Sequence, residues 1–207
     1  MKPSTPLPPV LQLALGAGAL APILYFGMQL AAAPFYPGYN FLTQAASDLG
    51  ASTYRYGAVF NVGALTVGGL LILASLGIGW ALRRMGTPVV LIAFVVVTVL
   101  AGGISSLWAG LVPLPDPAHG GHPALAMLMI FTPLALTLAL WRQPRVRPVL
   151  LLGVGIILAL IPVMSGALPI DTSSYMGLIQ RMLALAVFGS VGLSAWYLRT
   201  QVSARSG

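Results

Sequence analysis

Polar side chains gather in the segment Asn40–Gly50, which reads NFLTQAASDLG between two long apolar stretches. Asn40 is a residue type that caps helix starts, and Gly50 is a type that follows helix ends. Spacings of three and four place the polar residues on one helical face: Asn40, Thr43, Gln44, Ser47 and Asp48. We therefore expect a short amphipathic helix, with its polar face turned either to water or to a cavity among neighbouring helices.

The hydroxyl and carboxyl groups of this segment could support nucleophilic chemistry beside a base. Ser47 or Thr43 would be the nucleophile, Asp48 its neighbour, and a neutral His122 the general base. His122 precedes Pro123 and should cap the helix that follows, where the positive end of the helix dipole disfavours an imidazolium. Ser47, Asp48 and His122 are thus the candidate catalytic group, provided that the fold brings them together.

A second polar loop carries a donor set for a divalent metal. Asp116, His119 and His122 offer one carboxylate and two imidazoles, which suit zinc and related ions. Gly120 and Gly121 separate the two histidines, so the pair does not share a rigid helical face. The chain has no cysteine, which excludes an iron–sulfur cluster, and no lysine in an apolar stretch, which excludes a retinal Schiff base.

Arg181 is the only strong charge expected about one turn inside an apolar stretch, where a central charge costs about 2.5–3.5 kcal/mol on insertion scales. A carboxylate from Asp48, Asp116 or Asp171 is its expected partner. Two alternatives stay open: the side chain reaches to the interface, or it binds an anionic group such as a lipid phosphate. A candidate binding site groups Arg181 with three polar residues expected at similar depth: Asn40, Thr43 and Asn61.

The elements that must position these residues are membrane-spanning helices. The 207 residues are 58% hydrophobic and 6% charged, whereas about a quarter of a soluble domain is charged. Six apolar stretches can cross about 30 Å of hydrocarbon: residues 10–33, 58–82, 88–112, 124–141, 148–168 and 178–198. We expect one all-α domain over residues 1–207, a polytopic bundle of six transmembrane helices, with kinks at Pro22, Pro133 and Pro162.

Basic residues set the expected orientation of this bundle. Alternate loops carry eight Lys or Arg residues on one side against two, Arg55 and Arg181, on the other. By the positive-inside rule, both termini face the cytoplasm of a multi-pass protein in the cell membrane. The net charge of +7 then indicates affinity for anionic lipid headgroups and does not imply nucleic acid. The eight are Lys2, Arg83, Arg84, Arg142, Arg145, Arg147, Arg199 and Arg205.

Several short motifs resemble one known family. They are Tyr39-Asn40, then Ser47-Asp48-Leu49-Gly50, Phe60-Asn61-Val62-Gly63, and Gly110-Leu111-Val112-Pro113 before His122. In this order they are similar to the bacterial and archaeal domain-of-unknown-function family 998, over about residues 10–198. The resemblance implies a prokaryotic six-helix membrane protein and marks Asn40, Ser47, Asn61 and His122 as motif positions. It implies no reaction.

Two functions follow from these observations. The first is a non-catalytic accessory or lipid-binding membrane subunit with a polar site on the extracytoplasmic side, in contact with membrane lipids, a membrane-protein partner or a second copy. The alternative is an extracytoplasmic-face hydrolase or transferase acting on a lipid, with the metal site or Ser47 performing the reaction. The enzymatic function requires the fold to bring several of these residues together at one site, whereas the accessory or lipid-binding function does not.

Overall fold

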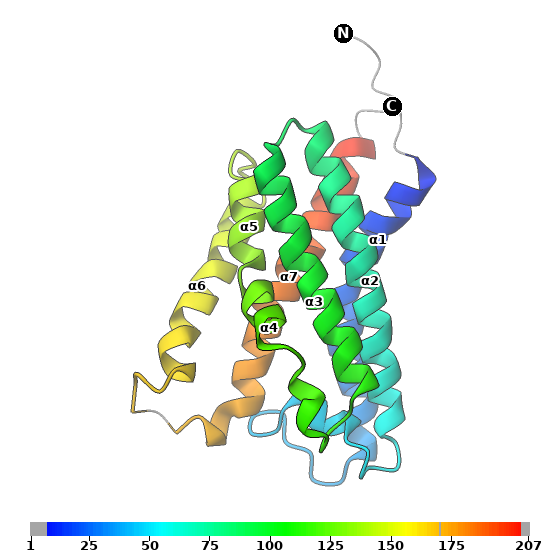
Figure 1. Ribbon diagram of the computed structural model, residues 1–207, viewed down its shortest axis with the longest axis vertical. Helices are drawn as coiled ribbons and strands as arrows, with labels where there is room; N and C mark the ends of the chain where they lie inside the picture. The colour runs from blue at the N-terminus through cyan, green and yellow to red at the C-terminus, as the bar shows by residue number, and fades with distance from the viewer. Residues whose placement is uncertain (1–7, 170, 204–207) are drawn as a thin grey trace.

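The structure, a computed structural model, describes residues 8–169 and 171–203, and within them all regular secondary structure is helical. Figure 1 shows long helices running side by side from end to end of the molecule. The α-helices are α1 (Pro9–Ala32), α2 (Gly57–Arg84), α3 (Val89–Leu111), α4 (Pro123–Ile130), α5 (Thr132–Ala139), α6 (Arg147–Met164) and α7 (Met176–Ser203). Short 3-10 helices are η1 (Ala33–Phe35), η2 (Ala46–Gly50), η3 (Pro117–Gly120) and η4 (Ser173–Tyr175).

Six helical segments of the described chain are long and apolar enough to cross a membrane. Five of them contain one long helix each, and the fourth, Pro117–Ala139, contains η3, α4 and α5. The all-α bundle of six spans expected from the sequence is confirmed, and the protein is a multi-pass membrane protein.

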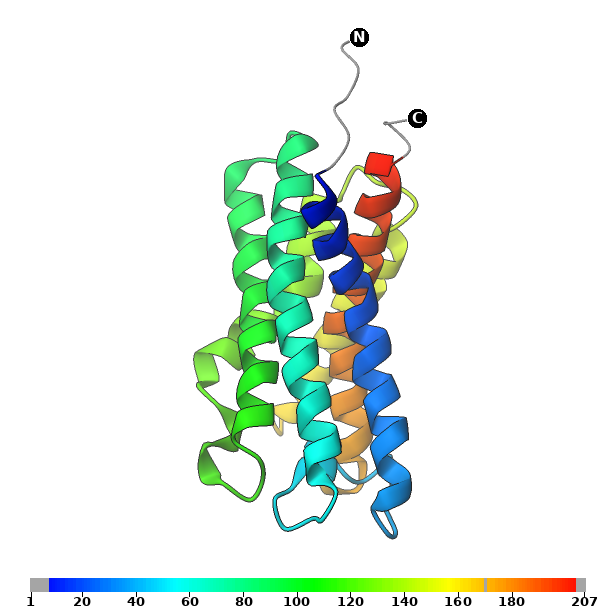
Figure 2. The ribbon, with the colours of Figure 1, turned by 90° about the vertical axis from the view of Figure 1, so that its right-hand side faces the viewer.

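The connections define two different ends of the bundle (Figure 2). The loop end carries the connections 33–56, 112–122 and 165–175, together with all three acidic residues of the chain. The arginine end carries the short connections 85–88 and 140–146. Its described basic residues are Arg83, Arg84, Arg142, Arg145, Arg147 and Arg199.

Helices α2 and α3 pack closely through glycine. A Cβ atom on Gly68 would lie 2.8 Å from the Gly103 carbonyl oxygen, and one on Gly103 would lie 3.0 Å from the Gly68 carbonyl oxygen. Such distances leave no room for a side chain at either position, so the two backbones touch. Small residues commonly allow this approach between membrane helices, because apolar side chains alone gain little over lipid.

The fourth span is interrupted at Phe131, where the sequence predicted only a kink. Pro133 has no amide proton and cannot donate to a carbonyl one turn earlier. It lies in the first turn of α5, where helical amides have no partner within the helix and a missing proton is tolerated. Phe131 takes φ −79° and ψ −4°, and its amide donates to the Leu128 carbonyl at 3.2 Å, a tight turn that ends α4. The span is therefore two eight-residue helices, offset from each other beside α3 in Figure 1.

The fifth span ends at Met164, four residues before the predicted boundary at residue 168. Gly166 takes φ +73°, a left-handed conformation that favours glycine and stops the helix. The carbonyl oxygen of Pro162, one turn earlier, accepts a hydrogen bond from the Ser165 hydroxyl at 3.3 Å. Residues 165–169 therefore leave the helix near the loop end.

Candidate functional site

Arg181 lies at the centre of the loop end and reaches from α7 into the first connection. Its Nη1 donates to the carbonyl oxygens of Phe41 at 2.7 Å, Gln44 at 3.0 Å and Gly177 at 2.8 Å. Its Nη2 donates to the Tyr39 hydroxyl at 2.5 Å. The guanidinium carbon also lies 4.8 Å from the Phe41 ring centroid, within the range of a cation–π contact. One cation thus gathers the backbone of residues 39–44 against α7.

Further contacts fix the same segment, which we call the cap (residues 39–50). The Tyr39 hydroxyl donates to the Ala45 carbonyl at 2.7 Å, and Gln180 accepts the Ala46 amide at 2.5 Å. Burial raises the pKa of the Tyr39 hydroxyl although the Arg181 guanidinium opposes the shift, so this hydroxyl stays a donor. A Cβ on Gly177 would meet the Phe41 and Gln44 carbonyl oxygens, which shows how closely the cap approaches α7.

The expected pairing of Arg181 with a carboxylate is wrong. No carboxylate of the described residues pairs with it, and its partners are three carbonyl oxygens and one hydroxyl. The cap backbone is largely non-helical, so its carbonyls lack intrahelical partners and are free to accept from the cation. The hydrogen-bond acceptors around the guanidinium are therefore all uncharged.

The amphipathic helix expected over Asn40–Gly50 is shorter and packs differently. Only Ala46–Gly50 is helical, as η2, because Asn40 Oδ1 accepts the Leu42 amide at 2.8 Å and Gln44 Oε1 accepts the Asn40 amide at 2.8 Å. Such local side-chain bonds compete with helical ones. Ala46 and Leu49 are buried against Met28 and Phe60 at the ends of α1 and α2. Ala46 and Leu49 thus face the bundle and not lipid, whereas Phe41 and Leu42, which belong to the same predicted apolar face, are exposed.

The candidate catalytic residues make local contacts. Asp48 Oδ2 accepts the Ala45 amide at 2.8 Å, which caps η2, and His122 Nδ1 accepts the Ala124 amide at 3.2 Å, which caps α4 as expected. Ser47 is half-buried, and Thr43 is exposed. Asn61 donates from Nδ2 to the Gly50 carbonyl at 2.9 Å and holds the end of the cap. Catalysis by Ser47, Asp48 and His122, and ligand binding by Asn40, Thr43, Asn61 and Arg181, stay predictions.

The histidine loop folds upon itself. Asp116 Oδ1 accepts the Ala118 amide at 2.8 Å, and His119 Nδ1 lies 2.6 Å from the Val112 carbonyl oxygen. Trp108 donates from Nε1 to the Ala118 carbonyl at 2.6 Å. Within residues 8–169 and 171–203, no three His, Cys, Asp or Glu side chains lie together as a metal site would require. Metal binding by Asp116, His119 and His122 therefore gains no support here.

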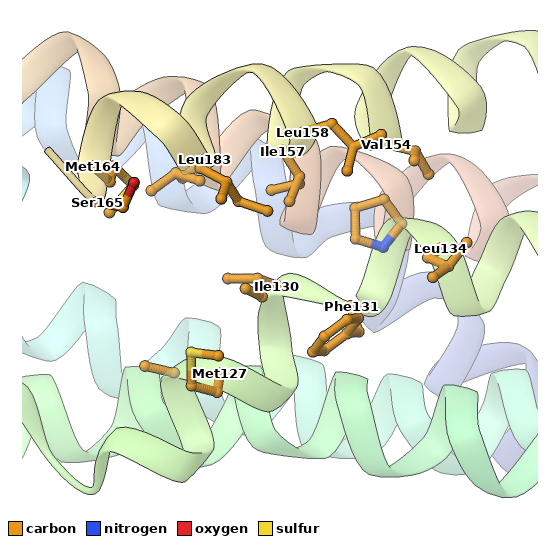
Figure 3. A pocket seen from close by; sticks show the side chains of 13 residues that line it. Met127, Ile130, Phe131, Leu134, Val154, Ile157, Leu158, Met164, Ser165 and Leu183 are labelled. Carbon is orange, nitrogen blue, oxygen red and sulfur yellow. The ribbon is translucent and has the colours of Figure 1, made fainter. Parts of the chain in front are cut away.

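One feature that the sequence did not indicate is an apolar cleft between the fourth and fifth spans. This lateral cleft has a volume of about 470 Å³ and is partly open. Figure 3 shows Ile157 and Leu158 of α6 facing Met127, Ile130 and Phe131 across it. Its lining is almost wholly apolar, with the Ser165 hydroxyl at the loop end. The helix break at Phe131 lies in one wall, which ties the cleft to Pro133.

A weak signal for this cleft exists in the sequence. Pro133 and Pro162 fall in consecutive spans; Pro133 follows the helix break at Phe131, and Pro162 lies inside α6 near its end. The width of the space depends on the distance between α4 and α6, which no local pattern encodes. The sequence predicted only kinks at the two prolines, and a kink does not by itself imply a cleft.

Fold and site together define an all-α, six-span integral membrane protein with a fixed cap at the loop end and an apolar cleft on one side. The chain belongs to the family described as "Protein of unknown function (DUF998)", which matches residues 19–197. The match confirms the resemblance carried by the short motifs. No curated protein and no solved structure matches the chain.

Proposed function

We propose that this protein is a non-catalytic, lipid-binding membrane protein that holds a lipid acyl chain in the lateral cleft. The observation that carries the proposal is the cleft itself. A volume of about 470 Å³ falls within the usual range for ligand pockets, roughly 300–1,000 Å³. Because its walls belong to the fourth and fifth spans, with Leu183 of the sixth, the surrounding medium is lipid, and an apolar chain is the ligand that matches the lining.

The position of the cleft indicates which part of the lipid it would take. The cleft extends from Val154, in the middle of α6, to Ser165 at the loop end. By the positive-inside rule, the loop end is extracytoplasmic. The ligand is then an outer-leaflet lipid whose chain lies between α4 and α6 and whose headgroup remains at the loop end. A buried headgroup would lack partners, since Ser165 supplies the only polar side chain of the lining.

The contacts at the loop end favour binding over catalysis. Asp48 and His122 each cap a helix through a backbone amide, and Arg181 is engaged by the cap. Groups held in this way stabilise the loop end of the bundle through contacts with the backbone. The accessory role expected from the sequence is compatible with this, since a protein that presents a lipid needs no reacting groups of its own.

The test is photocrosslinking with a phospholipid that carries a diazirine near the middle of its acyl chain. The purified protein is reconstituted with this probe, and the labelled peptides are mapped by mass spectrometry. We expect labels on α4 and α6 at residues of the lateral cleft. Val154→Phe places a ring in the cleft and should reduce labelling by more than half. Val149→Phe makes the same change on the same helix at an exposed position outside the cleft and should leave labelling unchanged.

Three outcomes would contradict the proposal. Labels spread evenly over all lipid-facing helices would mean that the cleft has no preference for a chain. Equal labelling of the Val154→Phe and Val149→Phe proteins would mean the same. A stoichiometric protein partner or second copy crosslinked to α6 in place of lipid would assign the cleft to a protein interface.

A further inference from the structure

A second cavity lies at the arginine end, in the angle between two connections. It has a volume of about 360 Å³ and is lined by the turn Met85–Pro88, by Leu91 of α3, by the last two residues of α5 and by residues 141–143 of the α5–α6 connection. It shares no lining residue with the lateral cleft. In contrast to the cleft, its lining combines polar and apolar groups. We call it the basal pocket.

Arg142 gives the basal pocket a positive charge. This side chain lines the pocket and is exposed, and no hydrogen bond or ion pair connects it to another described residue. All three acidic side chains, which lie within the described residues, are at the opposite end of the bundle, so no Asp or Glu side chain competes for its guanidinium. Guanidinium groups favour phosphate, because their paired donors match its oxygens.

Gln143 supplies a second donor beside Arg142. Its Oε1 accepts the hydroxyl of Tyr197, which is buried on α7, at 2.6 Å. This bond orients the amide and commits its acceptor to the protein, while Nε2 keeps its two protons for another acceptor. The pocket therefore contains one cation and one oriented amide donor, both suited to an anion that accepts hydrogen bonds.

The rest of the lining suits the start of an acyl chain. Leu91 of α3 and Leu138 of α5 belong to spans and continue the pocket away from the connections. Trp141 lies at the level of the connections, where tryptophan marks the membrane interface. The Arg147 guanidinium lies 5.3 Å from the Trp141 ring and holds this aromatic wall. Polar donors therefore lie at headgroup level and apolar side chains at chain level.

We propose that the basal pocket binds an anionic phospholipid of the leaflet at the arginine end, with the lipid phosphate on Arg142 and Gln143 and the first part of a chain against Leu91 and Leu138. Basic pockets between membrane helices are known to take anionic headgroups. This proposal does not depend on the lateral cleft, because the site lies at the other end of the bundle and recognises a headgroup rather than a chain.

The experiment is a titration of the full-length protein with phosphatidylglycerol or phosphatidylcholine, read by native mass spectrometry. We expect one phosphatidylglycerol to bind in preference. Arg142→Gln should weaken this binding about tenfold, and Arg142→Lys should weaken it less because the charge remains. Arg145→Gln removes the same charge from the same connection at an exposed position outside the pocket, and it is the matched control.

A measurement at high salt distinguishes a lipid headgroup bound in the pocket from general electrostatic attraction between anionic lipid and the basic end of the protein. At about 0.5 M ammonium acetate the Debye length falls to about 4 Å, so Arg145→Gln should then bind like wild type while Arg142→Gln stays weaker. Equal losses in the two variants, or equal affinity for the two lipids, would overturn the proposal. Displacement of phosphatidylglycerol by an equal concentration of inorganic phosphate would overturn the assignment to a lipid, since only the anion would then be recognised.

Discussion

The two sides of the bundle are built from similarly apolar helices but pack very differently. On one side, which we call the closed side, α2 and α3 touch backbone to backbone at Gly68 and Gly103. Half of the most apolar 18 residues of α2 are buried. On the other side, which we call the open side, a break separates α4 from α5, and the lateral cleft lies between these two helices and α6. Only 22% of the most apolar 18 residues of α6 are buried. Hydrophobicity alone thus does not decide whether two membrane helices close against each other.

Small residues and continuous helices make the difference. Glycine on α2 and α3 allows contact along two unbroken helices, whereas the lining of the cleft presents large side chains such as Phe131 and Leu158 beside a break. A membrane protein gains little by burying apolar surface that lipid would cover equally well, so close contact needs shape complementarity. The closed side is the tightly packed part that holds the bundle together, which we call the frame, and the open side has room for a lipid.

The largest effect is expected where the closed side would be forced apart. Gly68→Leu directs a side chain at the Gly103 carbonyl and the Leu107 amide, each 2.8 Å from the Cβ position, and should cost at least about 3 kcal/mol of stability. At the next residue, a Cβ atom on Gly69 would have no neighbour within 4 Å. Gly69→Leu should therefore change stability by less than about 1 kcal/mol, in the stabilising direction, because leucine favours a helix more than glycine does. The measurement is the thermal loss of monodisperse protein in detergent. Similar melting of the two variants would mean that the α2–α3 contact is not the frame.

The cap belongs to the closed side, since η2 packs on α1, α2 and α7. Arg181→Ala removes the donor to three carbonyls and the Tyr39 hydroxyl, and we expect a loss of about 2 kcal/mol together with faster hydrogen exchange in residues 39–46. The variant should leave chain labelling in the lateral cleft unchanged. Arg55→Ala, an exposed arginine at the same end, is the control and should change neither quantity. Unchanged exchange in the cap would show that the guanidinium does not hold it.

The fold could be predicted largely from sequence because span length and composition are local properties. All six spans were found, and His122 was correctly expected to cap the helix that begins at Pro123. The end of α6 was missed because Gly166 could have continued the helix or left it, and its positive φ depends on the connection as a whole.

The candidate site was harder to predict because its partners are backbone atoms. The sequence predicted a carboxylate partner for Arg181, whereas two of its acceptors are the Phe41 and Gln44 carbonyls. Their positions follow from a turn that Asn40 and Gln44 stabilise with their own side chains. Both cavities depend on distances between helices far apart in sequence. The affinity for anionic lipid headgroups that the charge pattern indicates stays a prediction.

The smallest effect is expected at the α6–α7 connection of the open side, where residues 171–175 make local hydrogen bonds. The hydroxyls of Ser173 and Ser174 donate to Asp171 at 2.6 and 3.0 Å and hold the pKa of this carboxyl below its usual value. A carboxyl whose pKa is lowered by folding stabilises the folded state above its unfolded pKa, near 3.9, and loses that contribution as the pH falls through the lower folded value. Below about pH 4 we therefore expect the amides of residues 173–175 to exchange faster, with no change in the spans.

Asp171→Asn tests this assignment, because the neutral amide cannot titrate in that range. Wild type and variant are compared at each pH, so that the intrinsic pH dependence of exchange cancels. The difference between them should be present at pH 6 and should shrink on acidification as the wild-type carboxyl is protonated. A constant difference would attribute the effect to the lost acceptor geometry instead of the charge. Exchange that spread into α2 or α3 would contradict the division into a closed and an open side, since a local contact on the open side would then support the frame.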